Sequence, residues 1–153
     1  MDVNNLNNIL DAFTNVLPQL GINNIQKTGM SLKEKFVKSS GVIVIIGTIG
    51  DIKGNIIYSL TEESAKKIAS KMMMGMPVDK FDDLAQSAIS ELVNMLTANA
   101  ATNFSNNNIK IDISTPTLIC GEFVANTNSD KIICVNISTD VAPIEVNIAL
   151  EKQ

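Results

Sequence analysis

Apolar residues recur every three or four positions along three stretches of the chain, a spacing that predicts amphipathic helices. Thr61 can cap the second of these helices, because its side chain can accept a hydrogen bond from a free backbone N–H of the first turn. The expected helices span residues 4–20, residues 61–75, and a long central stretch that begins at Asp79 or Asp82 and ends at about residue 104.

Between the helices, runs rich in valine, isoleucine and threonine predict strands. A turn with a glycine at each end, Gly50 and Gly54, joins two of these runs into a hairpin. The seven expected strands cover residues 30–37, 42–49, 54–60, 109–114, 117–124, 131–138 and 144–150. These elements predict an α+β fold: a largely antiparallel sheet, with the first and the long central helix displayed together and the methionine-rich helix packed elsewhere.

The order of the elements suggests two related halves, each a helix followed by strands. Sliding the chain by 79 residues lays residues 9–17 on residues 88–96 and superposes many of their apolar positions. Asn15 then falls on Asn94, whereas Ala12 falls on Glu91. We therefore expect an internal duplication whose first copy has lost its carboxylate.

The long central helix carries one polar stripe. Glu91 and Asn94 project together from it, because side chains three and four positions apart share a helix face. Such residues are often no more than solvated, but an asparagine in mid-helix is a locally unfavourable choice, which points to function. The small residues expected to leave this face open to a partner surface are Ser87, Ser90, Thr97 and Ala98.

Composition limits the chemistry open to this stripe. The chain has 153 residues, 45% of them hydrophobic, and a net charge of −4, and we expect one domain over residues 1–153. It contains no histidine and no arginine, which excludes histidine-based nucleophiles and most transition-metal sites and argues against a nucleic-acid surface. Cys120 and Cys134 lie in expected strands without a CxxC motif, so we expect two buried free thiols. With no membrane-length apolar run and no signal-like segment, the sequence predicts a soluble cytoplasmic protein.

Two motifs carry a family resemblance. The pattern Ser87-xxx-Glu91-xx-Asn94, followed by Pro116, resembles the signature of the CheC/CheX/FliY phosphatases of bacterial chemotaxis. The stretch Gly50-xxx-Gly54-xxx-Tyr58 is similar to a second pattern of that family. The half-repeat agrees with the family's pseudo-twofold fold, and one complete signature beside one degenerate copy is closer to CheX than to CheC.

This resemblance implies an enzyme that hydrolyses the aspartyl phosphate of a CheY-like receiver domain. Asn94 would orient the attacking water, and Glu91 would pair with a lysine of the receiver. The chain would need no cofactor or metal of its own, because the receiver would contribute its own magnesium ion. The family also implies a homodimer formed by joining sheet edges, with residues 131–138 and 144–150 as candidate edge strands.

Two other functions are compatible with the same residues. One is a non-catalytic adaptor that docks a receiver or a flagellar-switch protein through Glu91 without hydrolysis. The other is a hot-dog-type thioesterase with Glu91 as base and Asn94 as orienting group. The thioesterase would need an apolar acyl tunnel beside the pair, where Met95 is the large apolar neighbour.

Overall fold

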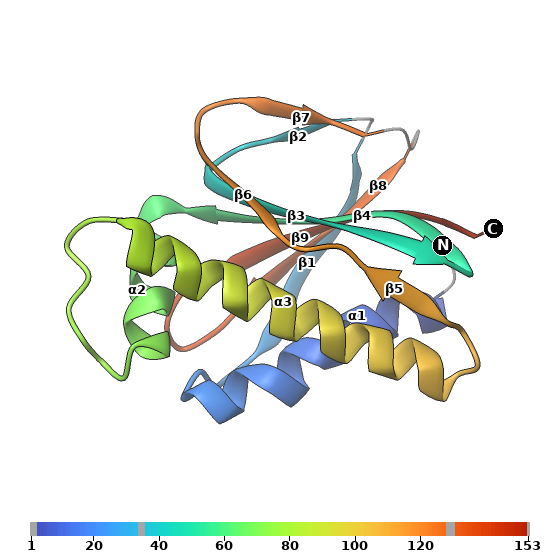
Figure 1. Ribbon diagram of the computed structural model, residues 1–153, viewed down its shortest axis with the longest axis horizontal. Coiled ribbons are helices and arrows are strands. Elements are labelled where there is room, and N and C mark those ends of the chain that lie inside the picture. The colour runs from blue at the N-terminus through green and yellow to red at the C-terminus, as the bar shows by residue number, and fades with distance from the viewer. Residues whose placement is uncertain (1–2, 34–35, 128–130, 153) are drawn as a thin grey trace.

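The computed structural model of the chain describes residues 3–33, 36–127 and 131–152. Helices pack on one face of an antiparallel sheet, and a short two-stranded ribbon lies on the other side of that sheet (Figure 1). In chain order the elements are α1 (Val3–Val16), η1 (Leu17–Leu20), β1 (Gln26–Lys33), β2 (Phe36–Lys38), β3 (Gly41–Gly50), β4 (Ile52–Thr61), α2 (Glu62–Met72), α3 (Asp83–Asn106), β5 (Ile111–Ile113), β6 (Thr117–Gly121), β7 (Val124–Asn126), β8 (Ile132–Ser138) and β9 (Ile144–Lys152). The predicted α+β class is confirmed.

The strand order shows the predicted pseudo-twofold repeat. From edge to edge the sheet runs β1-β8-β9-β4-β3-β5, with β6 also paired to β3 and every pair antiparallel. Outward from the central β9–β4 pair, β8 and β1 on one side correspond to β3 and β5 on the other. The strand β1 of the first half therefore pairs with the second half, and β5 of the second half pairs with the first. This exchange interlocks the two halves.

The register of the repeat differs by one residue from the predicted register. Ala12 is buried, with 1% of its surface exposed, whereas Glu91, its predicted counterpart, is exposed. The Ala12–Glu91 and Asn15–Asn94 pairings are therefore wrong, because a slip of one residue turns a helix face by about 100°. An offset of 80 residues instead pairs buried positions with buried positions: Ile9 with Ile89, Ala12 with Leu92, Phe13 with Val93, and Val16 with Leu96. With this offset the counterparts of Glu91 and Asn94 are Asp11 and Thr14, both exposed.

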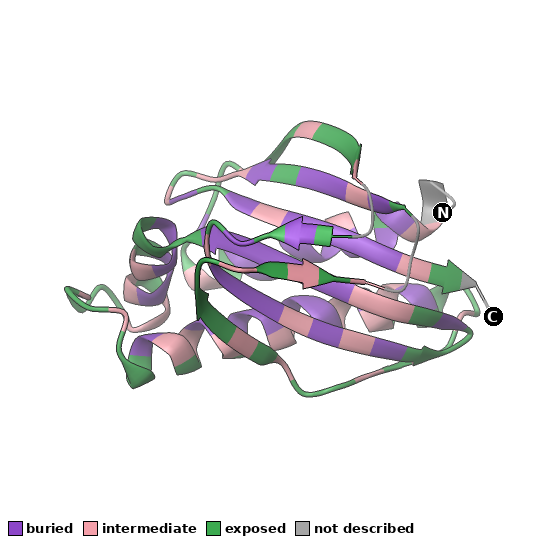
Figure 2. Cartoon of the chain, turned by 90° about the horizontal axis from the view of Figure 1, so that it is seen from above, coloured by how far each residue is buried: buried purple, intermediate pink, exposed green. Residues whose placement is uncertain are grey.

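The two long helices lie side by side and antiparallel (Figure 1), which confirms that they are displayed together. Asparagines join them along their length. Asn15 Nδ2 donates to Asn99 Oδ1 at 3.0 Å, and Asn103 Nδ2 donates to the backbone carbonyl of Asn8 at 2.9 Å. Figure 2 shows how the buried positions run along the central strands of the sheet, on which the apolar faces of these helices pack.

Two helices begin at the residues expected to cap them. The Thr61 hydroxyl accepts from the Ser64 N–H at 3.1 Å and so caps α2. Asp82 Oδ1 accepts from the Ala85 N–H at 3.0 Å and caps α3, so Asp82 rather than Asp79 starts the long central helix. No helix in the described part of the chain is long and apolar enough to cross a membrane.

Strand pairing overturns three predictions. The strand expected at residues 30–37 is two strands in different sheets: β1 pairs with β8, and β2 pairs with β7. The strand expected at residues 117–124 is divided in the same way: β6 ends at Gly121, and Val124 begins β7 in the other sheet. The two candidate dimer edges are both interior, because β8 lies between β1 and β9, and β9 lies between β8 and β4. A strand's neighbours are chosen by tertiary packing, which the local pattern of a single strand does not encode.

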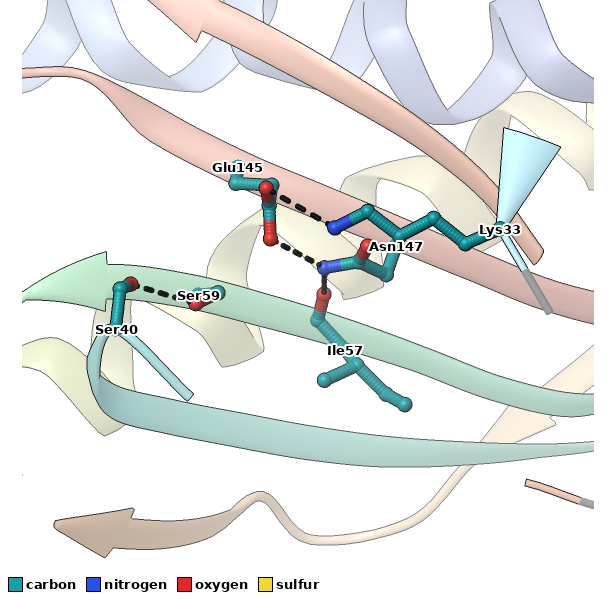
Figure 3. Close-up of polar contacts among 6 residues, drawn as sticks. All are labelled: Lys33, Ser40, Ile57, Ser59, Glu145 and Asn147. Atoms are coloured by element: carbon teal, nitrogen blue, oxygen red, sulfur yellow. Dashed lines mark hydrogen bonds and ion pairs between the residues drawn. The ribbon is translucent and has the colours of Figure 1, made fainter. Parts of the chain in front are cut away.

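The sheet face opposite α1 and α3 carries a partly buried polar group (Figure 3). Glu145 accepts from Lys33 Nζ at 3.4 Å through one oxygen and from Asn147 Nδ2 at 3.0 Å through the other. Both cysteines are free, as predicted, and Cys134 is buried beside this group, where burial and the Glu145 charge raise the pKa of its thiol. The predicted burial of Cys120 is wrong: it is exposed, because β6 is held to the sheet through β3 alone among the described strands.

Candidate functional site

Glu91 and Asn94 lie next to each other on the outer side of α3. Glu91 is exposed and Asn94 is half-buried, because Leu92, Val93 and Leu96 turn the opposite side of the helix into the core. The helix that carries them is 24 residues long. The carboxylate and the carboxamide therefore project from a rigid support, as the sequence predicts.

A shallow groove of about 530 Å³ runs between this side of α3 and the segment that leads from β5 into β6. The first wall consists of α3 residues Asp83, Gln86, Ser87, Ser90, Glu91 and Asn94, and the second of Thr115, Pro116 and Leu118. Pro116, which completes the sequence signature, thus lines the same groove as Glu91 and Asn94. The fold brings together residues that lie more than twenty positions apart in the chain.

Ser114 holds the second wall of the groove against the sheet. Its N–H donates to the Gly47 carbonyl at 2.9 Å, and its hydroxyl oxygen accepts from the Gly47 N–H at 2.8 Å. The same hydroxyl donates to the Thr115 carbonyl at 3.1 Å. Sequence reasoning missed Ser114, although a Ser-Thr-Pro run directly before a strand is typical of a turn closed by side-chain-to-backbone bonds.

Of the four residues predicted to border a partner, three are accessible. Ser87 and Ser90 line the groove, and Ala98 is exposed farther along α3. The prediction for Thr97 is wrong, because its side chain has no exposed surface. It follows the buried Val93 by about one helical turn, and its hydroxyl is hydrogen-bonded inside the protein. The partner-binding roles of Ser87, Ser90 and Ala98 stay predictions.

The groove is acidic. Its charged lining residues are Asp83 and Glu91, and no lysine is among the described residues that line it. Such a surface attracts a basic group of a partner. In the described part of the chain, no three cysteine, aspartate or glutamate side chains lie close enough together to hold a metal ion.

Solved structures share this architecture over nearly the whole chain. A CheC-like superfamily protein from Shewanella sp. PV-4 matches with a TM-score of 0.84 and 25% identity, over 99% of each chain. A chain of the CheX–CheY–BeF3–Mg2+ complex from Borrelia burgdorferi matches with a TM-score of 0.80 and 31% identity, over 96% of this chain and 97% of that one. The fold is that of the CheC-like class of proteins.

Sequence comparison gives the particular family. The family model for the chemotaxis phosphatase CheX matches residues 42–138, a segment that includes Glu91, Asn94 and Pro116. The CheY-P phosphatase CheX of Thermotoga maritima is 40% identical over 80 residues, and the match covers 52% of this chain and 52% of that protein. The chain belongs to the CheX family of chemotaxis phosphatases. It spans about half the length of this curated relative in that match.

Proposed function

We propose that this protein hydrolyses the aspartyl phosphate of a CheY-like receiver domain in chemotaxis signalling. The observation that carries the proposal is the pairing of Glu91 and Asn94 on one side of α3, beside an acidic groove that Pro116 also lines. The relative in Thermotoga maritima is a CheY-P phosphatase, and the Borrelia burgdorferi relative was solved with CheY, BeF3 and Mg2+.

Hydrolysis of an acyl phosphate does not require the protein to form a covalent bond with the phosphoryl group. It requires a water molecule held in line with the scissile bond and charge neutralisation on the phosphoryl oxygens. The Asn94 carboxamide suits the first task, because it accepts from and donates to one water without adding negative charge beside the phosphate. We assign charge neutralisation to the receiver's own magnesium ion and lysine, so that this chain contributes no metal or cofactor.

Glu91 suits docking better than water activation. It is exposed, it lines an acidic groove without a basic neighbour in that lining, and it precedes Asn94 by three residues. An ion pair between Glu91 and a receiver lysine would fix the register of the two surfaces and place Asn94 over the phosphoryl group. The two carboxylates of the groove would also attract the lysine from a distance.

The proposal extends to assembly and location. We expect a homodimer formed through a sheet edge, and β1 now replaces β8 and β9 as the candidate, because it pairs with β8 alone among the described strands. Two exposed apolar side chains of β1, Met30 and Leu32, support an edge that a second copy covers. This protein and its receiver would both act in the cytoplasm, where the receiver is phosphorylated.

The test is the lifetime of the phosphate on a purified CheY-like receiver labelled with acetyl phosphate. A substoichiometric amount of this protein should shorten that lifetime, with each molecule releasing more than one phosphate. If the protein is instead an adaptor, it will co-purify with the phosphorylated receiver and leave the lifetime unchanged. A lifetime unchanged at stoichiometric concentration would contradict the proposal.

Removing the Glu91 carboxylate should weaken docking more than turnover. In the Glu91→Ala variant we expect KM for the phosphorylated receiver to rise about tenfold, equivalent to about 1.4 kcal/mol, with a smaller change in kcat. Raising the ionic strength should weaken docking of the wild type more than docking of the variant, because salt screens the Glu91 ion pair that the variant lacks.

The control for Glu91 is Glu63→Ala. Glu63 is an α2 glutamate outside the groove whose side chain is 78% exposed, so this variant makes the same change without touching the proposed docking surface. Its KM should equal that of the wild type. An equal rise in KM in both variants would show a general charge effect and remove the docking role of Glu91.

A further inference from the structure

Within one helical turn of Asn94, a chain of hydroxyl groups ties α3 to the centre of the sheet. The Tyr58 and Thr97 hydroxyl oxygens are 2.9 Å apart, and the Thr97 hydroxyl donates to the Val93 carbonyl at 2.8 Å. Because a hydroxyl has one proton to donate, Thr97 must accept from Tyr58. The order of donation is therefore Tyr58 to Thr97 to the Val93 carbonyl.

This hydroxyl chain begins at a buried residue in the centre of the sheet. Tyr58 lies on β4, where its backbone is opposite Val44 on one side and Val146 on the other. Its side chain has 1% of its surface exposed, and its ring lies 6.2 Å from that of Phe13 on α1. Burial raises the pKa of Tyr58, so its phenol is protonated, and able to donate, at neutral pH.

The hydroxyl chain ends on the helical turn that carries Asn94. Val93 directly precedes Asn94, and Thr97 follows it by three residues, so the two hydrogen-bonded positions bracket the carboxamide. Packing between apolar surfaces alone permits small shifts and rotations of a helix. A hydrogen bond to the sheet is directional, so it restricts both the depth and the rotation of this turn.

We infer that Tyr58 and Thr97 are positioning residues for Asn94: they hold the turn from Val93 to Thr97 at the depth at which the carboxamide meets the attacking water. The inference rests on the proposed phosphatase function. Catalysis by positioning is sensitive to displacements of an ångström or less, so the anchor should matter more for turnover than for docking. A side chain that merely satisfied its own hydrogen bond would affect stability alone.

The test compares variants that cut the chain with one that preserves it. Tyr58→Phe removes the donor from the sheet, and Thr97→Val removes the central hydroxyl at similar side-chain size. We expect each to lower kcat about tenfold with KM for the receiver within about twofold of wild type. Thr97→Ser keeps the hydroxyl and should retain most of the wild-type kcat. In the double variant the loss should not exceed that of the larger single loss, because both changes break one chain.

The matched control is Thr48→Val. Thr48 is a second buried threonine, 2% exposed, whose hydroxyl donates to the Ile52 carbonyl at 3.2 Å within the β3–β4 hairpin. The control variant loses a comparable hydrogen bond, so it should lose stability and keep the wild-type kcat. Rates are measured well below each variant's Tm and normalised to the folded fraction, and Tyr58→Phe, the mildest change, carries the test if Thr97→Val does not fold.

A second readout needs no turnover. In 1H–15N NMR spectra, the side-chain NH2 signals of Asn94 should shift in Tyr58→Phe and stay in place in Thr48→Val. If Asn94→Ala slows hydrolysis but Tyr58→Phe and Thr97→Val keep the wild-type kcat, the positioning role is refuted and the proposed function stands. If Asn94→Ala leaves hydrolysis unchanged, the proposed function itself fails.

Discussion

The Asn94→Ala variant should bind the phosphorylated receiver about as well as the wild type and hydrolyse its phosphate about 100- to 1000-fold more slowly. The side chain is half-buried beside the groove, so its removal leaves the docking surface around Glu91 in place. What is lost is the group that holds the water in line, an interaction made fully in the transition state, and such a loss lowers kcat without raising KM. Phosphate lifetimes at several receiver concentrations separate the two parameters.

Two further variants sharpen that experiment. Asn94→Asp keeps the shape of the side chain but places a negative charge next to the phosphoryl oxygens, so it should also be slow. Asn106→Ala makes the same asparagine-to-alanine change on an exposed residue at the end of α3, outside the groove, and should match the wild type. Equal rates for wild type and Asn94→Ala would contradict the assignment of the water to Asn94.

The largest expected effect on stability is that of Gly54→Ala. Gly54 has φ of +150°, and an added Cβ would overlap the backbone carbonyl of Ala149 on β9. Because both partners are backbone in the central β4–β9 pair, neither can move without breaking the sheet where the two halves meet. We expect a loss of about 3–5 kcal/mol in the free energy of unfolding, the sum of overpacking and backbone strain. Denaturant unfolding followed by circular dichroism measures this loss.

Gly75→Ala is the control for this change. Gly75 also has a positive φ, of +87°, but an added Cβ there would have no heavy atom within 4 Å. The variant should lose about 1–2 kcal/mol, the cost of backbone strain alone. The difference between the two variants then measures the overlap with Ala149. Similar losses at both positions would show that the close approach of β4 and β9 is not what requires Gly54.

Local pattern predicted the elements well and their partners poorly. The spacing of apolar residues placed the helices. The cap at Thr61 was predicted and Asp82 was one of two candidates for the start of α3, because a cap bonds to its own first turn. The edges of the sheet could not be predicted this way: β8 and β9 have strand patterns that would suit an edge or the interior. The repeat was predicted one residue out of register. Matching apolar positions between the two helices did not decide whether Ala12 or Asp11 is the counterpart of Glu91.

In the candidate site, too, local features were predicted from sequence and long-range contacts were not. Glu91 and Asn94 were identified from sequence, because a helix fixes which of its own residues share a face. Thr97 was misassigned, because it is small and polar like Ser87 and Ser90 in the groove. Its burial depends on Tyr58, which is 39 residues away in sequence. The wall held by Ser114 and Gly47 was missed, because that contact joins residues 67 positions apart.

The sequence by itself determined the α3 stripe and limited its chemistry, since it holds no histidine and no arginine and offers a carboxylate beside a carboxamide. The tertiary structure decided what surrounds that stripe: the groove wall with Pro116, the central β4–β9 pair that closes on Gly54, and the hydroxyl chain from Tyr58 to Val93. The reason is the range of the interactions. Helical periodicity and capping act within a few residues, whereas the depth at which Asn94 sits depends on a strand that only the folded sheet brings beneath it.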